Sequence, residues 1–170
     1  NNGDMIFCGG IGEEGMFNDF DEGYLVKINK AGDIINSKII SKQDTSLIMH
    51  RIYKVSETEF ITFSMSASVI KPLQHILFYH KFDTEMNIIK ENKYMIPFED
   101  IELSGFKVLQ NYIGNIVLAG YFKYPLINCF DMFFWEFNSE GDSLNSNFIF
   151  STEPHWRLAI DMIEKKDLSG

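Results

Sequence analysis

Apolar and polar positions along the chain recur in the same order three times. An aromatic or β-branched run is followed by Asn or Asp, then by polar residues, and then by a second apolar run. The three copies are 24–33, 78–87 and 133–142, which lie about 55 residues apart. Each copy therefore predicts two antiparallel strands joined by a tight turn.

Turn chemistry supports this interpretation in two of the copies. The Asn that opens the turn in the first and third copies can bond the backbone, and Gly32 and Gly141 supply the positive φ that a following bulge requires. The middle copy has Met86 at the glycine position. We expect Asn87, the next residue, to take the left-handed conformation in a slightly displaced turn, because asparagine tolerates that region.

A further apolar run precedes each hairpin, and a connector with acidic residues leads from each hairpin to another apolar run. The pattern therefore predicts four strands for each unit and an all-β fold. The expected strands are 4–9, 23–29, 34–40, 49–55, 59–65, 75–82, 88–95, 103–109, 115–121, 130–137, 143–150 and 156–162.

Four-stranded units of about 55 residues are typical of β-propeller blades. The chain then divides into three repeats, 1–46, 47–101 and 102–155, with a strand of a further blade in 156–170. The alternative is a β-sandwich, which also consists of short strands with frequent turns but requires no repeat of this length.

The segment Lys27–Asp33, with the sequence KINKAGD followed by an apolar strand, carries a resemblance to a known family. It resembles the blade repeats of secreted bacterial propellers, including the quinoprotein-like group common in surface proteins of Bacteroidetes. The resemblance covers nearly the whole chain. It implies a propeller fold and an exported protein, in the periplasm or at the cell surface.

Composition and charge narrow the possible partners. A net charge of −9, from 24 acidic and 15 basic residues without a basic cluster, argues against nucleic acid or an anionic membrane as a partner. No apolar run approaches the roughly 20 residues that span a bilayer, so we expect no membrane insertion. The two cysteines, Cys8 and Cys129, lack CxxC spacing and are expected to be unpaired, mostly buried thiols.

One acidic segment, 18–23, superficially resembles a calcium loop. Its spacing does not fit the EF-hand pattern, so a solvated acidic loop is the favoured interpretation, and no metal or other cofactor is expected. In the less favoured interpretation the ligands of a cation are Glu13, Glu14, Asp19 and Asp21.

The two arginines define a candidate ligand site. Arg51 follows His50, and Arg157 follows His155 and Trp156, at equivalent positions near the start of an innermost strand. Innermost strands line the channel of a propeller, so we expect these five residues at its mouth. Arginine suits a carboxylate or phosphate, and tryptophan offers a face on which a sugar or ring can stack. The alternative is that both arginines pair with connector acids and hold blades together.

Other catalytic patterns are weak. His75 and His80 lie in or beside the second hairpin run and are expected on the strand surface, and the sequence has no Gly-x-Ser-x-Gly elbow. A pair of carboxylates facing each other across a cleft, as glycoside hydrolysis requires, is not visible in a sequence. The sequence therefore favours a non-catalytic binding or scaffold propeller that presents loops and a central channel to a protein or glycan partner. The alternative is a propeller enzyme that processes glycans.

Propellers close with 4 to 8 blades, and this chain holds about three. We therefore expect further blades, either from the same longer chain or from a second copy of it. The strand expected at 156–162 would then pair with a strand outside this covalent unit.

Overall fold

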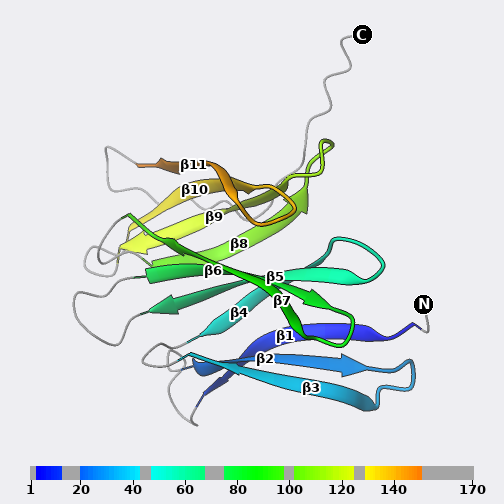
Figure 1. Cartoon of the computed structure of the whole chain (residues 1–170). Helices are drawn as coiled ribbons and strands as arrows, with labels where there is room; N and C mark the ends of the chain where they lie inside the picture. Colours follow the sequence, from blue (N-terminus) through cyan, green and yellow to red (C-terminus); the bar gives the residue numbers. More distant parts are fainter. Residues whose placement is uncertain are drawn as a thin grey trace. The chain divides into compact units, whose positions relative to one another are not determined.

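The computed structural model describes residues 3–12, 20–42, 47–67, 75–97, 102–124 and 129–150. Every regular element in these ranges is a β-strand, which confirms the all-β class (Figure 1). The strands are β1 (Met5–Gly12), β2 (Phe20–Ile28), β3 (Ile34–Ser41), β4 (Ile48–Lys54), β5 (Glu59–Ala67), β6 (His75–Asp83), β7 (Ile88–Met95), β8 (Glu102–Gln110), β9 (Ile116–Tyr124), β10 (Cys129–Phe137) and β11 (Ser143–Ile149). In the described part of the chain, no helix is long and apolar enough to cross a membrane.

The strands form three antiparallel sheets, each made of consecutive strands. The first sheet contains β1 to β3, the second β4 to β7 and the third β8 to β11. Each strand expected within the described ranges is present, with ends that differ by a few residues, and the strand expected at 156–162 lies outside them. The chain forms two compact units, Asn1–Asp100 with the first and second sheets and Ile101–Gly170 with the third.

The turn between β2 and β3 and the turn between β10 and β11 are held by the same hydrogen bonds. Asn29 Oδ1 accepts hydrogen bonds from the backbone N–H groups of Ala31 and Asp33, both at 2.9 Å. The Asn29 side-chain amide also donates to Asp33 Oδ2 at 3.0 Å. Asn138 makes the same contacts, including a side-chain bond to Asp142 at 2.9 Å. These bonds depend only on the local sequence, which explains why turn residues predict the hairpins well.

In the turn between β6 and β7 of the second sheet, the acid comes first and the amide last, which is the reverse of the order in the other two turns. Asp83 Oδ1 accepts from the backbone N–H groups of Glu85 and Asn87, at 2.9 and 2.8 Å. The Asn87 side-chain amide donates to Asp83 Oδ2 at 3.0 Å. These hydrogen bonds lower the pKa of Asp83, and the two that Asn87 donates have the largest effect. In each of the turns after β2, β6 and β10, one asparagine amide therefore donates a hydrogen bond to one aspartate carboxylate, and the two residues occur in either order along the chain.

Met86, and not Asn87, has the positive φ in this turn, so the expectation for Asn87 is wrong. The φ of Met86 is 62°, close to those of Gly32 at 92° and Gly141 at 74°. A side chain in this region costs roughly 1–2 kcal/mol. The Met86 side chain is fully buried in the core between the first and second sheets, and this packing offsets the steric cost.

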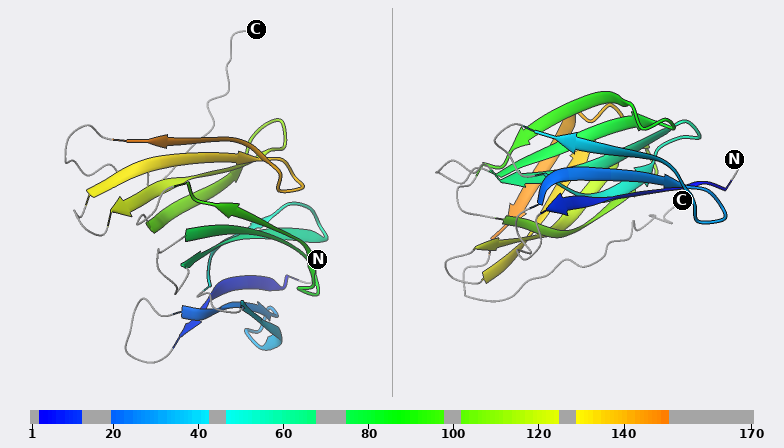
Figure 2. Two further views of the ribbon diagram at one scale, coloured as in Figure 1. Left: turned by 60° about the vertical axis from the view of Figure 1, so that its left-hand side comes forward. Right: turned by 90° about the horizontal axis from the view of Figure 1, so that it is seen from below.

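The first and second sheets stack face to face within their unit (Figure 2). Phe60 and Phe82 of the second sheet are stacked at 5.2 Å between ring centroids and face the first sheet, where Leu25 is fully buried. The other fully or nearly buried members of this core are Ile40, Leu47, Met49, Phe78 and Met86. The second sheet therefore depends on the first for the burial of one of its faces.

The turn between β6 and β7 is also bonded to the first sheet. Lys27 Nζ donates to the carbonyl of Thr84 at 3.4 Å, and the Asn36 side-chain amide donates to the carbonyl of Glu85 at 3.5 Å. Both bonds lie beside the buried Met86 side chain in sequence. They position the turn at one end of the stacked sheets, where Lys27 and Thr84 also line a groove.

Gly120 of the third sheet tests how tightly that sheet is packed. A Cβ there would lie 2.7 Å from Phe106 Cα and 3.0 Å from Phe133 Cε1, so backbone must move to admit it. We expect Gly120→Ala to lower the free energy of unfolding by about 2 kcal/mol. Gly9 has the same register in the first sheet, with no atom within 4 Å of such a Cβ.

Gly9→Ala is therefore the matched control for Gly120→Ala. Its stability should stay within about 0.5 kcal/mol of the parent, as for other open positions. Urea denaturation measures both values. Equal stabilities of the two alanine variants would show that the contact with Phe106 does not constrain the third sheet.

Candidate functional site

A groove of about 650 Å³ lies at the end of the first and second sheets where their hairpin turns gather. It receives side chains from the start of β1, the end of β2, both strands and the turn of the β4–β5 hairpin, and the turn after β6. The lining residues are Asp4, Ile6, Lys27, Ile52, Lys54, Ser56, Glu57, Thr58, Glu59, Phe60 and Thr84.

The carboxylates of this groove each contact a lysine. Asp4 lies 3.7 Å from Lys27, and Glu57 lies 2.8 Å from Lys54. Glu59 lies 3.1 Å from Lys81, which is almost fully buried. The hydrogen bond from Lys54 lowers the pKa of Glu57, so this carboxyl stays ionised. A general acid for glycoside hydrolysis requires a raised pKa, and Glu57 has the opposite property.

The floor of the groove is apolar and its rim is polar. Ile6 and Ile52 pack against the core cluster, and Phe60 belongs to it with only 5% of its surface exposed. Ser56 and Thr58, in the turn between β4 and β5, add hydroxyl groups to the rim. The groove thus combines a few apolar contacts with charges of both signs, as binding clefts commonly do.

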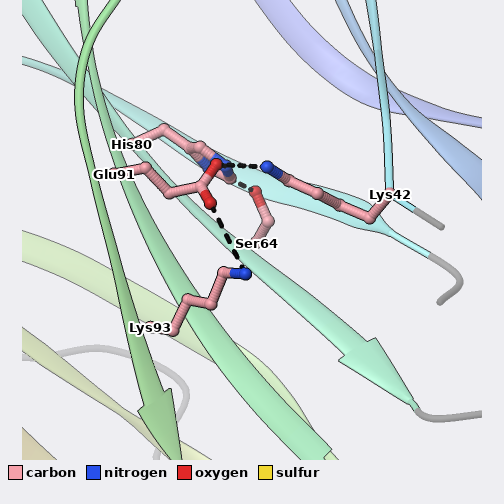
Figure 3. A network of polar contacts seen from close by, with 5 residues as sticks. All are labelled: Lys42, Ser64, His80, Glu91 and Lys93. Carbon is pink, nitrogen blue, oxygen red and sulfur yellow. Dashed lines mark hydrogen bonds and ion pairs between the residues drawn. The ribbon is translucent and has the colours of Figure 1, made fainter.

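A second cluster of polar side chains extends from the buried Ser64 and His80 to the partly exposed Lys42 and Glu91 and the exposed Lys93 (Figure 3). Ser64 Oγ lies 3.3 Å from His80 Nδ1, and Glu91 Oε2 lies 3.2 Å from His80 Nε2. Lys42, at the end of the first sheet, donates a short hydrogen bond to Glu91. Lys93 lies 3.9 Å from the other carboxylate oxygen. The cluster thus links an acid of β7 to a lysine that follows β3.

The order serine, histidine, acid is that of a hydrolase triad, but this cluster does not meet the requirements of one. Ser64 and His80 are both fully buried, so no substrate reaches the hydroxyl group. The contact between His80 Nε2 and Glu91 lacks hydrogen-bond geometry, and within the described residues that nitrogen has no hydrogen-bond partner. A triad requires an accessible nucleophile and a histidine oriented by its acid.

Burial determines the charges in this cluster. Burial lowers the pKa of His80 to about 4, against the opposing effect of the Glu91 carboxylate and with a further lowering by Lys42. Burial alone would raise the pKa of Glu91, but the hydrogen bond from Lys42 and the nearby positive charges lower it overall. The cluster at neutral pH therefore holds a neutral imidazole beside an ionised carboxylate.

Phe78 completes this arrangement. Its ring is stacked on His80 at 5.7 Å, while the amino groups of Lys42 and Lys93 lie 5.6 and 5.4 Å from its centroid. Cation–π contacts of this kind are stronger where the lysine is partly removed from water, as Lys42 is at 24% exposure, than for Lys93 at 59%. The aromatic ring and the carboxylate of Glu91 together hold both lysines at the margin of the core.

The expectation that His75 and His80 lie on the strand surface is wrong. His75 is 8% exposed and His80 is not exposed at all. The first sheet covers the face of the second sheet on which His80 lies, and no local pattern reveals that contact. One signal was available: Glu91 lies directly opposite His80 in the strand pairing, so the histidine has an acidic neighbour on the adjacent strand.

The predicted arginine site is only partly visible. His50 and Arg51 belong to β4, and Arg51 is exposed and pairs with Phe63 of β5. His155, Trp156 and Arg157 lie outside the described residues. The convergence of the two arginines therefore stays a prediction.

The nearby Cys8 is free and half-buried. Burial raises the pKa of its thiol to about 11, against the opposing charge of Arg51. The thiol is therefore protonated at neutral pH and a poor nucleophile.

The alternative cation site is also largely outside the described part of the chain. Glu13, Glu14 and Asp19 fall there, while Asp21 belongs to β2. Among the residues that the structure describes, no group of three or more His, Cys, Asp or Glu side chains could hold a metal ion.

No protein-family model matches this chain, and no curated protein matches it either.

Proposed function

We propose that this chain is a non-catalytic binding or scaffold module built from β-propeller blades, and that the groove between the first and second sheets receives a segment of a partner protein. The observation that carries the proposal is the lining of the groove, where paired charges of both signs surround an apolar floor. Polypeptide segments present charged, polar and apolar side chains together, which such a lining accommodates.

Three features support the assignment of the sheets to propeller blades. The described sheets are antiparallel and consist of consecutive strands, and the same turn closes a hairpin in each. The first sheet also covers one face of the second, as neighbouring blades do. We also propose, from the family resemblance, that the protein is exported. The proposal includes a ligand site with Arg51 at the channel of the propeller.

A protein partner suits the groove better than a glycan. Sugar rings stack on accessible aromatic faces, and the aromatic side chain of this groove, Phe60, is 5% exposed. A glycan remains the second candidate through Trp156, which lies outside the described residues. The enzymatic alternative is weaker, because Glu57 is held ionised and the serine of the buried cluster is inaccessible.

The test is selection of binding peptides from a random library displayed on phage, with the chain as bait. We expect peptides whose binding is lost in Thr58→Trp, because an indole at the rim fills the groove. Asn145→Trp, at an exposed position of β11, is the matched control and should leave binding unchanged. The expected loss is at least about tenfold in the dissociation constant.

Two further assays distinguish the alternatives. Binding to a glycan array with no selected peptides would favour the glycan partner, and hydrolysis of chromogenic glycosides would establish an enzyme. Peptides that bind both tryptophan variants equally would show that the groove is not the binding site.

A further inference from the structure

The first sheet has two faces with different surroundings. One face, with Leu25, packs on the second sheet. The other, which we call the outer face, carries Met5, Phe7, Ile11, Tyr24, Val26 and Ile39, which the strand pairing places on the side opposite to Leu25. Several of these side chains are widely exposed: Met5 49%, Phe7 47%, Ile11 39% and Ile39 52%.

The second sheet shows what such a face normally contacts. Phe60 and Thr62 hold the register positions of Met5 and Phe7, and Phe78 holds that of Tyr24. All three are at most 5% exposed. Phe60 and Phe78 belong to the core in which this face meets the first sheet. The same face of two successive sheets is therefore covered in the second and open in the first.

The covering surface has a recognisable composition. It is the face of the first sheet with Ile6, Cys8 and Leu25, in which Cys8 and Leu25 are directly opposed in the strand pairing. The third sheet of this chain has a face of the same register, in which Ala119 is opposed to Phe134. Ala119 and Phe134 are half-buried and retain accessible surface. One chain thus carries both an open outer face and a surface equivalent to the one that covers it.

We propose that the outer face of the first sheet binds a second copy of this chain, through the face of the third sheet that carries Ala119 and Phe134. The contact is heterologous, because two different surfaces meet, so one copy of a pair keeps a free outer face and the other keeps a free third-sheet face. Exposed apolar faces of this kind commonly mark association sites in proteins. The site is separate from the groove of the proposed function.

Analytical ultracentrifugation of the whole chain over a concentration series tests the proposal. The chain has a mass of 19.7 kDa, and we expect the average mass to rise from this value towards twice it or more as concentration increases to about 100 µM, a range that reveals micromolar dissociation constants. A constant mass of one chain over the whole range would overturn the proposal.

Surface variants locate the contact. Phe7→Lys and Ile39→Lys place a charge on the outer face and should each weaken association at least about tenfold. Ile89→Lys is the matched control, since Ile89 is an exposed isoleucine of β7 at 51%, and it should associate like the parent. Equal weakening by all three would indicate a nonspecific effect and contradict the proposal.

Mixing variants tests whether the contact joins two different surfaces. Phe134→Lys should also associate weakly by itself. If circular dichroism shows that Phe134→Lys is unfolded, Tyr121→Lys, on the same face of the third sheet, replaces it in the experiment. An equal mixture of Phe7→Lys with the third-sheet variant should form a heterodimer, because one intact surface of each kind remains. Unchanged association of the third-sheet variants would show that the outer face meets another surface and would overturn the proposal.

Discussion

Replacement of Met86 by alanine is expected to lower the free energy of unfolding by about 3 kcal/mol. The methionine side chain is fully buried in the core cluster that also contains Leu25, Phe60 and Phe82, so its removal leaves a cavity between the first and second sheets. Alanine also keeps the steric cost of the positive φ, because it retains a Cβ. Equilibrium denaturation in urea measures the change. A loss below about 0.5 kcal/mol would show that the side chain contributes nothing to the core.

Two glycine-related variants separate packing from backbone strain. Met86→Gly removes the same side chain but relieves the strain, so it should be about 1 kcal/mol more stable than Met86→Ala. Gly32→Ala introduces the strain alone, at φ 92° in an exposed turn with no atom within 4 Å of the new Cβ. It should cost about 1 kcal/mol. If Met86→Gly is less stable than Met86→Ala, the backbone account of this turn is incorrect.

Acidification is expected to remove about 3 kcal/mol of stability through His80 between pH 7.5 and pH 4. The pKa of His80 is about 4 in the folded chain, against an ordinary value of 6.5. Between these values the unfolded state binds a proton that the folded state does not, so stability falls as the pH falls through this window. The lowered pKa of Glu91 acts in the same direction at more acidic pH, since the unfolded chain takes up its proton first.

His80→Phe is the control, because a phenyl ring can stack between Phe78 and Phe82 without titrating, while Glu91 and Lys42 remain paired. Unfolding free energies of parent and variant are compared from pH 7.5 to pH 4. The other titrating groups are common to both chains, so the difference reports on His80 and on its effect on Glu91. Direct NMR titration of the imidazole should give a pKa near 4. A midpoint near 6.5 in the folded chain would contradict the buried, neutral assignment.

The strands and turns follow from local sequence, which is why the all-β class could be predicted. Asn29 and Asn138 bond the backbone within their own turns, and Gly32 and Gly141 have the positive φ expected of them. Each of these contacts lies within five consecutive residues. No knowledge of the rest of the fold is needed to recognise them.

The errors concern contacts between sheets. His80 was expected on a surface because its own strand does not reveal which face the first sheet covers. Local propensity favours Asn87 over Met86 for the positive φ, because a methionine is strained there, and only the packing of the Met86 side chain between two sheets reverses that preference. The arginine site could not be placed from the sequence for a related reason, since its geometry depends on how sheets are arranged.

The turns that follow β2, β6 and β10 are alike in their hydrogen bonds but differ in what they need from their neighbours. The turns with Gly32 and Gly141 have no side chain to accommodate at the positive φ, so each can close by itself. The turn with Met86 reaches its native conformation at low cost only when the first sheet is present to receive the side chain. Formation of the second sheet is thereby coupled to its neighbour, and these two sheets fold as one cooperative unit rather than as independent repeats.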